Sequence, residues 1–88
     1  MKILHLNLHK KWFDEILAGT KKIEYREIKP YWTKRLFNSD GTSKKFYIIL
    51  FRNGYSKDCR KMKVEFKGIR KGKKEYEILL GDVLKTES

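Results

Sequence analysis

The chain has 88 residues, which leaves room for one modest hydrophobic core and predicts a single domain over residues 1–88. Its aromatic content of 14% argues against disorder, although 38% of the residues are charged. One cysteine excludes an intrachain disulfide, and no apolar stretch approaches the ~20 residues of a membrane span, so we expect a protein of the reducing cytoplasm without a membrane partner.

The first 37 residues change period three times. Residues 2–8 alternate, with leucines on one side, which predicts a strand. Apolar residues at 12, 13, 16 and 17 then follow the spacing of an amphipathic helix. Gly19 stands where a left-handed C-cap residue is expected, so this helix should end near Ala18. Residues 22–28 alternate as a second strand, and Pro30 begins a short helix or turn that reaches Phe37.

The second half of the chain is richer in strands. Residues 38–44 have the composition of a loop. Residues 46–51 are nearly all apolar, which predicts a central strand buried on both faces. The alternation of residues 62–69, followed by Gly72 and a returning strand over residues 76–80, predicts a hairpin. We expect residues 85–88 to fray. The expected fold class is therefore α+β, with one helix after the first strand, a short second helix, and strands that close towards a barrel.

The positive charge is concentrated in one part of the chain, which we call the basic segment. Residues 57–74 have a net charge of +7, and the whole chain has +11. Such a concentration attracts polyanions, of which phosphate backbones are the commonest in cells, although a solvated surface that promotes solubility is the alternative. The candidate nucleic-acid-binding residues are Lys57, Arg60, Lys61, Lys63, Lys67, Arg70, Lys71, Lys73 and Lys74.

A recognisable motif lies where the first predicted helix meets the second predicted strand. The pattern is GxKxxExR, and its fixed positions are Gly19, Lys21, Glu24 and Arg26. In this context the motif resembles the signature of the ASCH domain family, and residues 29–32 and 51–55 are similar to a small phage-like subset of that family. The resemblance covers most of the chain. It implies a PUA-like mixed β-barrel with a basic cleft beside the motif for RNA, single-stranded or structured, or for a nucleotide-like ligand.

The motif residues suit such a ligand. Strand alternation places Glu24 and Arg26 on one face, whereas Lys21 has the opposite parity and can join them only if it belongs to the turn after Gly19 or precedes a bulge. The resemblance implies that Arg26 binds phosphate or a base edge, with Lys21 as a point charge and Glu24 as an acceptor. An exposed salt bridge at a strand edge is the alternative explanation of the trio. The candidate ligand-binding residues are Gly19, Lys21, Glu24, Arg26, Trp32, Arg52 and Tyr55.

Two of those residues are aromatic. We expect Trp32 and Tyr55 to offer stacking surfaces for bases, because a base stacks on a ring with about 1–3 kcal/mol. The hydrophobic core is the other possible place for either ring. We expect no cofactor and no metal site, because His5 and His9 need not share a face and Cys59 is the only thiol.

Other functions stay open. Some members of the family remove an acyl group from modified cytidine, with the motif lysine and a threonine where this chain has Glu24. A carboxylate beside Lys21 keeps the ammonium protonated and weakens it as a base. A small hydrolase acting on a modified nucleoside or on RNA is therefore an alternative in which Lys21 and Glu24 are catalytic and Glu24 is the base. A domain that binds an acidic protein partner is the third possibility.

Overall fold

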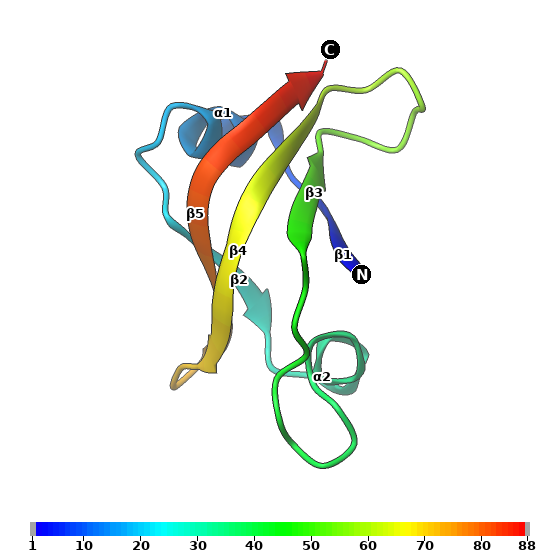
Figure 1. Ribbon diagram of the computed structural model, residues 1–88, viewed down its shortest axis with the longest axis vertical. Helices are drawn as coiled ribbons and strands as arrows, with labels where there is room; N and C mark the ends of the chain where they lie inside the picture. Colours follow the sequence, from blue (N-terminus) through cyan, green and yellow to red (C-terminus); the bar gives the residue numbers. More distant parts are fainter. Residues whose placement is uncertain (1, 88) are drawn as a thin grey trace.

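The computed structural model describes residues 2–87 and shows the predicted order of elements (Figure 1). The elements are β1 (Ile3–Asn7), α1 (Lys10–Leu17), β2 (Ile23–Glu27), α2 (Pro30–Leu36), β3 (Ile48–Arg52), β4 (Lys61–Lys71) and β5 (Glu75–Glu87). α1 ends at Leu17, and Gly19 follows with a φ of 83°, as its sequence position predicted. Neither α1 nor α2 is long and apolar enough to cross a membrane.

All of these strands belong to one mixed sheet with the order β1-β3-β4-β5-β2. β1 and β3 are parallel, and every other neighbouring pair is antiparallel. β4 and β5 bend along their length (Figure 1), and the register between them shifts at three places from Lys63 to Gly68. Such irregularities bend and twist a sheet, so the sheet curls into a half-barrel whose free edges are β1 and β2.

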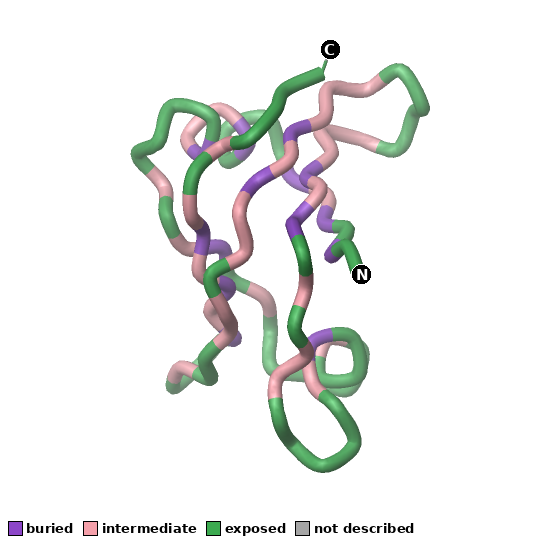
Figure 2. Tube along the Cα trace, in the orientation of Figure 1, coloured by how far each residue is buried: buried purple, intermediate pink, exposed green. Residues whose placement is uncertain are grey.

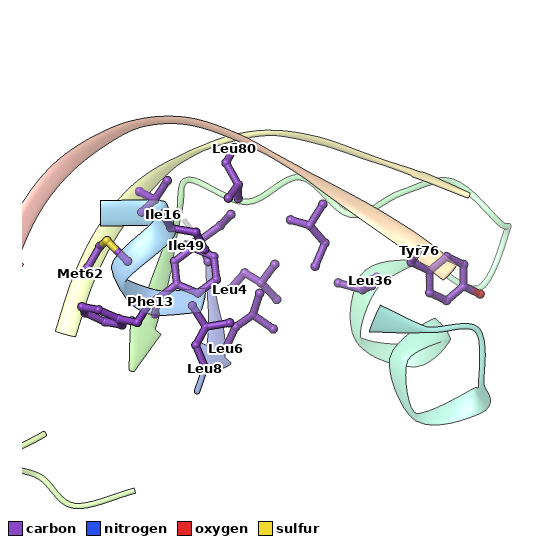
Figure 3. Packing of buried hydrophobic residues seen from close by; sticks show 13 residues of the cluster. Leu4, Leu6, Leu8, Phe13, Ile16, Leu36, Ile49, Met62, Tyr76 and Leu80 are labelled. Carbon is purple, nitrogen blue, oxygen red and sulfur yellow. The ribbon is translucent and has the colours of Figure 1, made fainter. Parts of the chain in front are cut away.

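The hydrophobic core fills the concave side of the half-barrel. Many of the buried stretches lie along the strands in Figure 2, whereas the tips of the loops are exposed. α1 packs Phe13 and Ile16 into the cluster, and α2 contributes Leu36 (Figure 3). Trp12, which the helical period placed on the apolar side of α1, is 38% exposed instead. The core therefore takes one narrow stripe of α1 and leaves Trp12 available at the surface.

The last strand is longer than the sequence predicted. β5 was expected over Tyr76–Leu80, with residues 85–88 fraying, but it continues to Glu87, which pairs with Lys61 of β4. Ser88 lies outside the described residues. The expectation was wrong because residues 81–87 are largely polar, while the ladder that holds them is made by backbone groups. A smaller correction concerns β3, which begins at Ile48 rather than at residue 46.

A cleft between the two free edges of the sheet

A cleft of about 1050 Å³ lies between the free edges of the half-barrel; we call it the seam cleft. Residues 5–9, at the end of β1, and residues 24–26 of β2 line it consecutively. Successive side chains of a strand point to opposite faces of the sheet. Since neighbouring residues of both strands line the cleft, the cleft must lie along the edges of these strands rather than on one face. The other lining residues are Trp12, Lys21, Tyr31, Trp32, Arg35, Arg52, Tyr55 and Glu75.

The motif carboxylate is buried in the wall of this cleft. Glu24 is 5% exposed, the one charged residue classed as buried among residues 2–87. Its Oε1 lies 3.4 Å from Nζ of Lys21, and its Oε2 contacts Nη1 of Arg26. The side chains of Lys21 and Arg26 are only 13% and 15% exposed. The trio is thus a salt-bridged group on the edge strand β2, as the alternative explanation expected, but it is largely buried rather than exposed, because this face of β2 points inward while Tyr25 is 40% exposed.

The turn after α1 brings Lys21 to this carboxylate. The N–H groups of Thr20 and Lys21 both donate to the carbonyl of Glu15, which tightens the turn around Gly19. A Cβ at Gly19 would meet nothing within 4 Å, so glycine is required there by its positive φ rather than by crowding. The left-handed residue reverses the chain direction, and Lys21 reaches Glu24 despite its opposite strand parity.

Arg26 connects the two free edges. Its Nη2 donates to the carbonyl of Asn7 on β1 at 3.0 Å, and its Nη1 donates to the carbonyl of Tyr25 on β2 at 2.8 Å. The guanidinium also lies 5.1 Å from the ring centroid of Trp32. Because Nη1 and Nη2 are both engaged within the protein, Arg26 holds the seam together and leaves little of its planar fork for a ligand.

Two other arginines are free to meet a ligand. Arg35 stacks on Tyr31 with its guanidinium carbon 3.9 Å from the ring centroid, and both residues line the cleft. Within residues 2–87, neither Arg35 nor Arg52 has a carboxylate partner. Sequence reasoning missed Tyr31, Arg35 and Trp12 as lining residues. The i, i+4 spacing of Tyr31 and Arg35 on a short helix was the signal that could have found the first two.

The structure places both expected stacking residues at the cleft. Trp32 lines the cleft and also packs against the core, so it occupies both of the places that the sequence left open for it. Tyr55 is 92% exposed and belongs to the loop between β3 and β4. That loop is fixed to β1, because the Asn7 side chain donates to the Gly54 carbonyl at 2.7 Å and accepts from the Gly54 N–H at 3.0 Å.

Lys21 lies among the aromatic residues of the cleft. Its ammonium is 4.8 Å from the ring centroid of Trp12 and 5.1 Å from that of Tyr25, which are cation–π distances. Five aromatic residues and four cations thus surround the same cleft, with only Glu24 and Glu75 as carboxylates. The arrangement offers flat apolar surfaces together with positive charge.

The basic segment lies elsewhere. None of its nine cations lines the seam cleft. They follow β4 from the loop before it to the hairpin after it, two turns that lie at opposite ends of the molecule in Figure 1. Arg60, Lys67 and Arg70 are paired with Asp14, Glu65 and Glu77 respectively. The expected ligand-binding residues and the expected nucleic-acid patch are therefore two separate surfaces.

His5, His9 and Glu24 all line the seam cleft, but residues 2–87 contain no group of three or more His, Cys, Asp or Glu side chains placed to hold a metal ion. Glu24 has a cation at each carboxylate oxygen. This carboxylate therefore holds Lys21 and Arg26 in place.

Comparisons with known proteins add no assignment. No protein-family model, no curated protein and no solved structure matches this chain. The ASCH resemblance of residues 19–26 therefore stays a prediction. The functional argument is carried by the chemistry of the seam cleft and of the basic segment.

Proposed function

We propose that this chain is an ASCH-type, PUA-like RNA-binding domain that holds RNA or a nucleotide in the seam cleft. One observation carries the proposal: five aromatic residues and four cations line a single cleft. Two of these cations, Arg35 and Arg52, have no carboxylate partner among residues 2–87. Single-stranded nucleic acid is bound by this combination, in which rings stack on bases and cations meet phosphates.

The hairpin tip extends the binding surface beyond the cleft. Lys71, Lys73 and Lys74 are exposed and make no ion pair within the described chain, and Glu75, the next residue, already lines the cleft. An RNA strand with one nucleotide in the cleft can thus run its phosphates over the tip. In this arrangement the cleft selects an unpaired nucleotide, and the basic segment supplies attraction that does not depend on sequence.

A binder agrees better with the cleft than a hydrolase. Any proton that Glu24 accepted would break its ion pairs with Lys21 and Arg26, which hold these two cations in place. We therefore expect no release of acetate when the protein is incubated with N4-acetylcytidine. Turnover that Glu24→Gln abolishes, while RNA binding persists, would replace the binder by a hydrolase.

The binding proposal is tested by Tyr55→Ala, with Tyr47→Ala as a matched control. Both tyrosines are exposed, at 92% and 62%, so neither change should unfold the protein, and only Tyr55 lines the cleft. By fluorescence anisotropy with a short unstructured RNA, Tyr55→Ala should weaken affinity about 5- to 150-fold and Tyr47→Ala should not change it. Equal affinities for all three proteins, or tighter binding of heparin than of RNA, would contradict the proposal.

A further inference from the structure

The backbone of β1 has a free edge inside the seam cleft. Leu8 donates its N–H to the carbonyl of Arg52 on β3 at 2.8 Å, and the carbonyl of Lys2 accepts from Tyr47 at 2.8 Å. Even-numbered residues of β1 therefore direct their N–H and C=O groups towards β3. Because backbone direction alternates along a strand, the odd-numbered residues direct theirs into the seam. The bond from Arg26 to the carbonyl of Asn7 agrees with this alternation.

His5 is the residue where this free edge meets the cleft. It is exposed, it lines the cleft, and β1 has no strand partner on this side among residues 2–87. The carbonyl of the next odd residue, Asn7, is occupied by Arg26. His5 therefore presents an N–H donor and a C=O acceptor side by side, with no partner for either in the described chain.

We propose that the Watson–Crick edge of an unpaired nucleobase binds the N–H and C=O of His5. This inference rests on the proposed RNA-binding function and names the part of the RNA that the cleft reads. Every base offers a neighbouring donor and acceptor, such as N6–H and N1 of adenine or N4–H and N3 of cytosine, so each can complete the pair. A phosphate has only acceptors and would leave the carbonyl of His5 unsatisfied.

The surroundings of His5 suit a base. Tyr55 belongs to the loop that Asn7 fixes, and Asn7 is two residues from His5, a step of about 6.6 Å along a strand. A ring of this kind can cover a base that is bound at the strand edge. An extended peptide fits less well, because Arg26 bridges the two edges and a continuous added strand would have to break that bridge.

The first test separates the backbone of His5 from its side chain. His5→Pro removes the imidazole together with the N–H, which points away from β3, and proline is tolerated on the free side of an edge strand. His5→Val removes the imidazole and keeps the N–H. We expect His5→Pro to bind RNA about 5- to 30-fold more weakly than His5→Val, because both variants lack the imidazole and only the proline variant lacks the N–H. Equal losses in both variants would overturn the inference.

The second test uses the unaltered protein and hydrogen exchange read by NMR. The His5 amide should exchange fast in the free protein and slow at least tenfold with RNA, whereas an oligomer of the same length with abasic sites should leave it fast. RNA binding with unchanged His5 exchange, or equal slowing by the abasic oligomer, would overturn this inference and leave the proposed function standing. Absence of any RNA binding would remove the proposed function itself, and the inference with it.

Discussion

The seam cleft and the basic segment use positive charge in different ways. In the cleft, Lys21 and Arg26 are largely buried and share the carboxylate of Glu24. In the basic segment, six of nine cations have no carboxylate partner among residues 2–87, and most side chains are exposed. Buried, paired charges fix geometry, whereas exposed, unpaired charges attract polyanions at a distance. Mutations should therefore affect stability in one region and salt dependence in the other.

The largest expected effect is the loss of stability in Glu24→Ala. Removing the carboxylate leaves two poorly solvated cations, a change that typically costs about 3–5 kcal/mol. Glu27→Ala is the matched control on the same strand, because the side chain of Glu27 is 77% exposed and its pair with Lys29 is worth at most about 1 kcal/mol. Urea unfolding measures both. Similar losses in the two variants would show that the buried trio has no special role.

The second prediction concerns salt. If the three tip lysines and one further cation contact phosphate, the logarithm of RNA affinity should fall against the logarithm of salt with a slope of about 2.8, from ~0.7 per contact. Changing Lys71, Lys73 and Lys74 together to Gln should reduce that slope to about 0.7 without loss of stability. Tyr55→Ala should lower the affinity and keep the slope. A slope near zero in the unaltered protein would remove the electrostatic part of the account.

The third prediction separates strain from function. Gly19 and Gly41 both have a positive φ, 83° and 88°, and neither has an atom within 4 Å of the position that a Cβ would take. Gly19→Val and Gly41→Val should therefore each cost about 1–2 kcal/mol through backbone strain. Only Gly19→Val should also weaken RNA binding, because its turn places Lys21. Wild-type stability and affinity in Gly19→Val would show that this glycine is an ordinary loop residue.

The smallest effect is a pH dependence at the ion pair that links Asp14 of α1 to Arg60 of the basic segment. Hydrogen bonds from Lys10 and then Arg60 hold the pKa of Asp14 below its usual 3.8. A carboxyl group with a lowered folded pKa adds stability above its unfolded pKa and loses it as the pH falls through the folded value. Thermal melts should therefore show less destabilisation below pH 3.8 in Asp14→Asn than in the wild type. Identical acid profiles would mean that this link does not contribute.

Local patterns predicted the order of elements but not the environment of the motif. The periods of residues 2–8 and 12–17 and the position of Gly19 indicated β1, α1 and its end correctly, because these features depend on local geometry. Alternation in β2 showed which side chains share a face, but not which face the core would cover. Which face of β2 the core covers depends on the curl of β4 and β5. This curl arises from bulges that no short sequence pattern reveals.

The cleft itself is a property of topology. β1 and β2 are its edges only because β3 inserts beside β1 and β5 pairs with β2, and both pairings join residues far apart in the chain. The free backbone of His5 follows from the same pairings. The motif predicted Lys21, Glu24 and Arg26 as one site, but the separation of this site from the basic segment required the three-dimensional structure.

The most direct test of two separate surfaces is a map of amide shifts in the ¹⁵N-labelled protein as a short unstructured RNA is added at moderate salt. The account predicts the largest shifts at residues 5–7, 24–26 and 52–55 around the seam cleft, with smaller changes at the hairpin tip over residues 71–74. Shifts confined to the basic segment, with the amides of β1 and β2 unmoved, would contradict the claim that the cleft holds the ligand.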